Sequence, residues 1–151
     1  MKAQPIALAM GKAEVIQDGT DIAIFGLGAL LPLAKETALR LSKLGLSVAV
    51  INPRFVKPID RACVEHYGHQ CGLVITFEDH VLAGGFGSSV LETLSAAEIN
   101  TPVVRIGWPD QFIEHGKVES LREKYGISVD GALHEAQPYL DAILQERLAH
   151  Q

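Results

Sequence analysis

Residues 21–36, DIAIFGLGALLPLAKE, decide the fold class, because an apolar run there stops at glycines and a helical pattern follows at once. A continuous apolar run is typical of a strand that is covered on both faces of a sheet. The spacing of apolar residues predicts a helix over 30–45, with Pro32 in its first turn and Gly45 at its C-terminal cap. This stretch therefore predicts a strand–turn–helix unit of an α/β protein.

The same alternation continues along the chain. Further apolar runs predict strands at 13–21, 46–54, 72–80 and 101–110. Helical patterns cover 58–70, 84–99, 116–127 and 129–150, where Pro138 either starts or kinks the last helix and an apolar stripe contains Leu140, Ile143, Leu144 and Leu148. Strand–helix units of about 25 to 30 residues predict an open parallel sheet with helices on both faces and right-handed crossovers.

Composition and charge exclude several classes of function. The 151 residues, 48% hydrophobic and 21% charged, have the size and composition of one globular domain. A net charge of −5 without any Lys/Arg run argues against nucleic acid and anionic membranes as partners. No apolar stretch reaches about 18 residues and no signal-peptide pattern is present, so we expect a cytoplasmic protein without a transmembrane helix.

Two cysteines, Cys63 and Cys71, do not form a C-x-x-C pair, so their spacing does not favour zinc. We expect both to be buried or half-buried thiols in a reducing compartment.

The glycines at 26 and 28 resemble the start of a dinucleotide-binding turn, which needs G-x-G-x-x-G/A and an acidic residue after the next strand. Here Leu31 stands at the third glycine position, and Asn52 and Arg54 follow the next strand. We therefore interpret the two glycines as a tight strand-to-helix turn rather than a nucleotide site.

A second glycine-rich stretch, LAGGFGSSVLETL at 82–94, leads into a predicted helix. The start of a helix can bind an anion or a partner's carboxylate through its free N–H groups. Alternatively, the glycines allow close backbone packing and the serines cap the helix. The spacing leaves both interpretations open.

Polar side chains follow two of the predicted strands. Glu78, Asp79 and His80 end one strand, at the edge where open α/β sheets bind ligands, and Asp110, Glu114 and His115 follow the next. They could serve acid–base chemistry or contact another domain. Their scattered spacing does not favour a metal site, and the sequence contains neither G-x-S-x-G nor a Walker motif.

Three stretches in order, RFVKPID (54–60), FEDHVLAGGFGSSVLETL (77–94) and RIGWPDQFIEHGKVESLREKYGIS (105–128), resemble the C-terminal domain of the transketolase family. The resemblance is strongest to 1-deoxy-D-xylulose-5-phosphate synthases and covers roughly residues 10 to 145. It implies a three-layer α/β/α domain with a mixed five-stranded sheet whose first strand, around 13–17, is antiparallel. Residues 1–11 would form a linker or arm and residues 12–151 the domain.

The resemblance implies that two other domains of such enzymes bind thiamine diphosphate and Mg²⁺. One of these two domains carries a Gly-Asp-Gly motif. This chain lacks that motif; its Asp-Gly pairs are Asp18-Gly19 and Asp130-Gly131. We therefore expect no catalytic, cofactor-binding or metal-binding residue in this chain and no activity on its own. It would be an excised C-terminal domain or a split-gene small subunit of a transferase that joins pyruvate and glyceraldehyde 3-phosphate in isoprenoid precursor synthesis.

Two alternatives remain at this point: a stand-alone small-anion-binding or regulatory module, and the C-terminal domain of a pyruvate dehydrogenase-type beta subunit. In the preferred reading, the partners are the thiamine diphosphate-binding domains, in cis or in trans, and homodimerisation is compatible with it. The expected docking face comprises polar residues at strand ends and the second glycine-rich turn: Arg54, Lys57, Asp60, Glu78, Asp79, His80, Gly84, Gly85, Gly87, Ser88 and Ser89.

Overall fold

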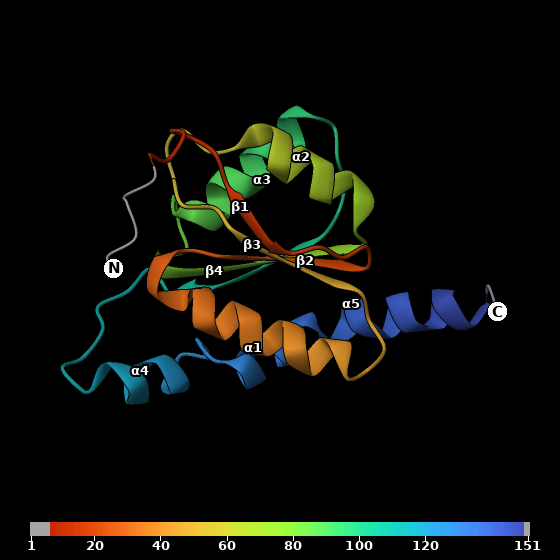
Figure 1. The fold of residues 1–151 in the computed structure, drawn as a ribbon. Coiled ribbons are helices and arrows are strands. Elements are labelled where there is room, and N and C mark those ends of the chain that lie inside the picture. Colours follow the sequence, from red (N-terminus) through yellow and green to blue (C-terminus); the bar gives the residue numbers. More distant parts are fainter. Residues whose placement is uncertain (1–6, 150–151) are drawn as a thin grey trace, which may run out of the picture.

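The fold is one five-stranded sheet between two layers of helices (Figure 1). The computed structural model describes residues 7–149, except for the side chains of Glu146, Leu148 and Ala149. The strands are β1 (Glu14–Gln17), β2 (Ile22–Gly26), β3 (Val48–Asn52), β4 (Leu73–Val81) and β5 (Val103–Trp108). The helices are η1 (Gly28–Leu30), α1 (Leu31–Ser42), α2 (Arg61–Gln70), α3 (Phe86–Ala96), α4 (Val118–Lys124) and α5 (Val129–Ala149).

The strand order in the sheet is β1-β3-β2-β4-β5. Strands β2 to β5 are parallel, and β1 pairs antiparallel with β3. The predicted mixed sheet with an antiparallel first strand is confirmed. We call the edge at which the four parallel strands end the carboxyl edge.

Both faces of the sheet are covered because its central strands are apolar on both sides. In β2, Ile22 and Ile24 pack under α1 and α5, whereas Ala23 and Phe25 pack under α2 and α3. All five residues of β2 are buried. Figure 1 shows α2 and α3 above the sheet and α1 and α5 below it, so the predicted three layers are confirmed.

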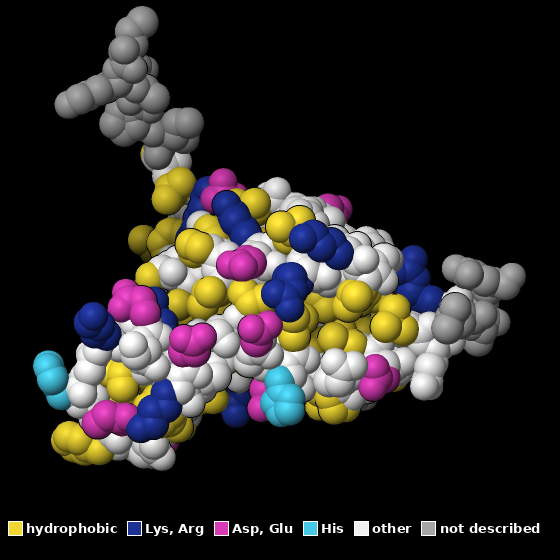
Figure 2. All heavy atoms as spheres, turned by 90° about the horizontal axis from the view of Figure 1, so that it is seen from below, with side chains coloured by type: hydrophobic (Ala, Val, Ile, Leu, Met, Phe, Trp, Pro, Cys, Tyr) yellow, Lys and Arg dark blue, Asp and Glu magenta, His cyan; other side chains and the backbone are white. Residues whose placement is uncertain are grey.

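The last helix is continuous from Val129 to Ala149 and contains Pro138, so this proline does not start it. On the predicted stripe, Leu140 is buried and Ile143 and Leu144 are half-buried, while the side chain of Leu148 lies outside the described part. None of the described helices combines the length and apolarity that crossing a membrane requires. On the face formed by α1, α4 and α5, Lys and Arg side chains are interspersed with Asp and Glu (Figure 2).

The turn between β2 and α1 is tight, as predicted. Gly28 has φ +57°, a left-handed conformation that favours glycine. A Cβ atom on Gly26 would lie 2.7 Å from Cβ of Ala34 and 2.9 Å from Cα of Leu31. The Leu31 side chain packs against the core rather than leaving room for a phosphate. The turn therefore serves close helix–strand packing.

The antiparallel direction of β1 brings the N-terminal segment to the carboxyl edge. Glu14, at the start of β1, lies opposite Asn52, at the end of β3. Residues 7–13 therefore approach the sheet from this edge, on the left in Figure 1. Residues 1–6 of the predicted arm lie outside the described part, and the boundary at residue 12 stays a prediction.

Gly26→Ala tests the close packing of this turn. We expect the free energy of unfolding to fall by about 1–3 kcal/mol, since the added methyl group must displace helix backbone. Lys35→Ala, at an exposed position of α1, is the control and should change it by less than about 0.5 kcal/mol. Chemical denaturation measures both; equal midpoints for Gly26→Ala and the native chain would contradict the packing argument.

Candidate functional site

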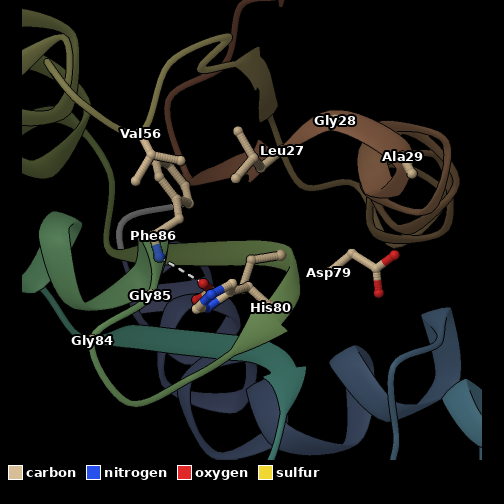
Figure 3. Close-up of a pocket in the computed structure, with 10 residues that line it drawn as sticks. Leu27, Gly28, Ala29, Val56, Asp79, His80, Gly84, Gly85 and Phe86 are labelled. Atoms are coloured by element: carbon tan, nitrogen blue, oxygen red, sulfur yellow. Dashed lines mark hydrogen bonds between the residues drawn. The ribbon is translucent and has the colours of Figure 1, made fainter.

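A groove of about 420 Å³ opens at the carboxyl edge (Figure 3). It lies between the β2–α1 turn, the end of β4 and the start of α3. Its lining comprises Leu27, Gly28, Ala29, Val56, Glu78, Asp79, His80, Gly84, Gly85 and Phe86. The predicted edge is therefore hollowed, and five of the predicted docking residues line the hollow.

The walls of this groove are largely apolar. Figure 3 shows the side chains of Val56 and Phe86 next to one another, with Leu27 beside them. Phe86 is anchored in the core, whereas Val56 is 42% exposed. Such a surface suits an apolar side chain from a partner better than a charged small molecule.

The Glu78 carboxylate forms the base of the groove and is fully buried. Its Oε2 accepts a hydrogen bond from the Phe86 N–H at 2.6 Å, and its Oε1 accepts one from the Gly87 N–H at 2.8 Å. These donors are the first free amides of α3, where the helix dipole favours negative charge. The chain's own carboxylate thus fills the anion site at this helix start.

This arrangement decides between the two interpretations of the second glycine-rich stretch. An external anion has no free place at the α3 N-terminus, because Glu78 already holds it. Glu78 also does not present its carboxylate to the surface, although we expected it on the docking face. Its role is to hold the loop that carries the other residues.

Close packing explains two of the three glycines of this loop, and backbone conformation explains the third. A Cβ atom on Gly85 would collide with the Glu78 carboxylate, and one on Gly87 would lie 2.8 Å from Oγ1 of Thr76. Gly84 has φ +72°. Close packing is therefore confirmed for Gly85 and Gly87. Around Gly84 a Cβ atom would meet nothing within 4 Å, so this glycine serves the turn through its left-handed backbone.

The predicted serine cap is wrong. The residue that precedes α3, Gly85, has no side chain to cap it, and Glu78 takes that role from β4. Ser88 instead donates from Oγ to the Leu82 carbonyl at 2.9 Å and accepts from the Gly84 N–H at 3.1 Å. Ser89 donates to the Gly85 carbonyl at 3.4 Å. The serines close the loop rather than begin the helix.

Two other predicted docking residues fasten the N-terminal segment. Arg54, which has φ +60°, forms an ion pair from Nη2 to Oε2 of Glu14 at 2.8 Å. Asp60 caps α2 by accepting from the Cys63 N–H at 3.3 Å, and it also accepts from the Ala13 N–H at 3.0 Å. Both side chains act within the chain.

Asp79 ties β4 to the neighbouring elements. Its Oδ1 accepts from Nε1 of Trp108 at 2.7 Å, and its Oδ2 pairs with Arg122 of α4. His80 and Lys57 are exposed at the groove and beside it. Among the charged residues predicted for the docking face, these two are the most available to a partner, beside the apolar walls of the groove.

One of the three polar residues after β5, Glu114, holds a loop in place. The Glu114 carboxylate accepts from the Tyr125 hydroxyl at 2.7 Å and pairs with Lys124. These contacts, with Lys124 first, lower the pKa of Glu114 to about 2. Asp110 and His115 are exposed. Residues 7–149 contain no group of three or more His, Cys, Asp or Glu side chains that could hold a metal ion.

Both cysteines are free thiols, Cys71 buried and Cys63 half-buried, as the sequence predicted. Burial, reinforced by Asp60, raises the pKa of Cys63 to about 11. Burial, with Asp21 and Asp18, raises that of Cys71 to about 12. Neither thiol is suited to act as a nucleophile at neutral pH.

The sequence matches the family described as transketolase, C-terminal domain, over residues 11–131. The chain belongs to the transketolase C-terminal domain family. It is 57% identical over 140 residues to the 1-deoxy-D-xylulose-5-phosphate synthase of Acidobacterium capsulatum and 53% identical over 136 residues to that of Methylacidiphilum infernorum. These alignments cover 93% and 90% of this chain but 22% of each relative, so it spans about a fifth of their length.

Solved structures of the family share the fold. A split-gene transketolase in an inactive beta4 tetramer aligns with a TM-score of 0.79 and 34% identity, over 90% of this chain and 43% of that one. The transketolase of Leishmania mexicana aligns with a TM-score of 0.59 and 18% identity, over 88% of this chain and 18% of that one. With these matches, neither alternative function is needed.

Sequence reasoning missed the apolar residues of the site. Leu27, Val56 and Phe86 line the groove, and Phe112 is fully exposed in the loop after β5. A large apolar side chain inside a polar loop that contains proline or glycine would have indicated such residues, as in RFVKPID and PDQFIEHG.

Glu78→Ala tests the buried carboxylate. We expect the free energy of unfolding to fall by about 3 kcal/mol, because two buried amide donors lose their acceptor. Glu92→Ala, at an exposed position of α3, is the matched control and should shift it by less than about 0.5 kcal/mol. Denaturant titration distinguishes the two; a small effect of Glu78→Ala would mean that water satisfies the α3 amides.

The Glu114 contacts predict a pH dependence. Because its pKa is lowered, the carboxylate stabilises the loop at any pH above the ordinary value of 4.5 and loses this contribution as the pH falls toward about 2. NMR titration of the side-chain carboxyl should give a midpoint near 2 in the native chain and a clearly higher one in Lys124→Ala. A native midpoint near 4.5 would show that the contacts do not persist in solution.

Proposed function

We propose that this chain is the C-terminal domain of a thiamine diphosphate-dependent transferase of the 1-deoxy-D-xylulose-5-phosphate synthase type. The observation that carries the proposal is the 57% identity to such a synthase across 93% of the chain. The reaction would join pyruvate and glyceraldehyde 3-phosphate. The cofactor and its Mg²⁺ would be held by the other part of the enzyme, and this domain would contribute to assembly rather than to chemistry.

The domain docks on the cofactor-binding region through its carboxyl edge. The path of the N-terminal segment supports this choice, since residues 7–13 reach the sheet at that edge. Asp60 accepts there from the Ala13 N–H, and Arg54 pairs with Glu14. In a protein of the relatives' length, the preceding region would join the domain at this place. A partner region connected there is held close to the groove at high effective concentration.

The chemistry of the edge suits a protein surface. Leu27, Val56 and Phe86 offer apolar walls, and Lys57 and His80 lie exposed around them. An apolar centre with a polar rim is the usual anatomy of an interface. The rim charges would set orientation more than affinity.

Three further points belong to the same proposal. The partner region can be supplied in cis or in trans, and the assembled enzyme is a homodimer. A cytoplasmic location remains part of it, supported by two cysteines that are free thiols.

Reconstitution tests the proposed function. This chain is co-expressed with the part of the Acidobacterium capsulatum synthase that it does not match. We expect the two to co-purify and the complex to form 1-deoxy-D-xylulose 5-phosphate, while neither part does so alone. Val56→Asp should weaken association at least about tenfold, because it places an unpaired charge in the apolar centre.

Leu44→Asp is the matched control. Leu44 is 58% exposed in the turn before β3, at the opposite edge of the sheet. The Leu44→Asp substitution should leave association and activity unchanged. Equal losses in both variants, or no association of the native chain, would refute docking through the carboxyl edge.

A further inference from the structure

The loop between β5 and α4, residues 109–117, carries a fully exposed phenylalanine. Phe112 has more exposed surface than any other large apolar side chain in the described part. The loop extends from the carboxyl edge, because β5 runs parallel to β2 and β4. Figures 1 and 2 show this loop and α4 at the left end of the molecule, where hydrophobic side chains reach the tip.

The loop is held by contacts with α4 and with Tyr125, the residue that follows α4. Glu114 binds both Lys124 and the Tyr125 hydroxyl. The ring of Tyr125 packs edge-on against Trp108, with centroids 5.9 Å apart. Gly116 packs closely on Leu121, leaving only 3.2 Å for a Cβ atom. Phe112 is therefore presented from a loop that is held at both ends.

An exposed aromatic ring on a fixed loop has the properties of an interface anchor. Aromatic residues dominate binding energy when they enter a pocket, and a preorganised loop avoids the entropy cost of ordering on binding. Within the fold itself, the exposed Phe112 ring contributes nothing to the core. The position of the Phe112 ring therefore suits contact with a partner rather than packing within the domain.

We infer that Phe112 is the anchor by which this domain enters an apolar pocket of the cofactor-binding region, with Glu114 as the residue that positions it. The inference rests on the proposed function and names its central contact. The loop and the groove lie at the same edge of the sheet, and the N-terminal segment also leads there. This shared position favours the cofactor-binding region as the partner that Phe112 contacts. The relatives hold nearly four fifths of their length outside the matched part, which is ample surface for such a pocket.

The charges around the loop define the rim of that pocket. Asp110, next to the anchor, is exposed and has no ion-pair partner within residues 7–149. Glu119 and Glu123 on α4 are exposed as well. Lys117, at the end of the same loop, is also exposed. The partner pocket is therefore apolar in its centre, with charges of both signs at its rim.

A double-mutant cycle tests the anchor in the reconstituted pair. The dissociation constant between this chain and the cofactor-binding region is measured by calorimetry for the native chain, Phe112→Ala, Glu114→Gln and the double variant. We expect Phe112→Ala to weaken binding about thirtyfold and Glu114→Gln about threefold. Glu114→Gln should have no further effect in the Phe112→Ala background, because it acts through the position of the ring.

Leu39→Ala is the control, since Leu39 is an exposed apolar residue on the outer side of α1. It should bind like the native chain, and thermal unfolding should be unchanged by both alanine substitutions. Native binding that Phe112→Ala leaves intact would overturn the anchor but not the proposed function. No binding by the native chain would overturn both. If Phe112→Ala binds the cofactor-binding region like the native chain but no longer self-associates, the anchor is overturned in favour of a second copy as occupant.

Discussion

The carboxyl edge depends on one interaction, the buried carboxylate of Glu78 at the start of α3. Its two oxygens accept the Phe86 and Gly87 amides, and its size leaves no room for a side chain at position 85. The loop is thereby pressed against β4, and Phe86 is set into the groove wall. A charge buried this deeply is tolerated only because both oxygens are hydrogen-bonded at a helix N-terminus. The shape of the groove follows from this pairing.

The same interaction explains how a fold that resembles nucleotide-binding domains can serve another purpose. Such folds bind anions where a glycine-rich turn enters a helix. In this chain the turn before α1 is filled by packing between Gly26 and Ala34, and the start of α3 is filled by Glu78. Both positions are closed from inside the molecule. What remains open at this edge is a groove with largely apolar walls, a kind of surface that suits a protein better than a phosphate.

Most of the fold could be predicted from the sequence, because buried parallel strands and amphipathic helices leave periodic apolar patterns. The antiparallel β1 followed from the resemblance alone, since four residues carry no sign of direction. The site was harder for a local reason: β4 continues to Val81, past the acidic residues that we placed at its end. Successive side chains on a strand point to opposite faces. Glu78 therefore faces α3, while its neighbour Asp79 reaches Trp108 and Arg122, although the two look equivalent in the sequence.

The distribution of partners within the chain changes which residues can recognise another surface. Arg54, Asp60, Glu78 and Asp79 all have internal partners, so the charges that first suggested a docking face are used to build it. Besides the exposed Lys57 and His80, the large side chains that these loops present are Val56 and Phe112, apolar residues in otherwise polar loops. The polar residues hold these loops in place, and the loops in turn expose their apolar residues. A loop held this firmly can keep an aromatic ring exposed to water, and the removal of such a ring from water on binding would favour association with a partner.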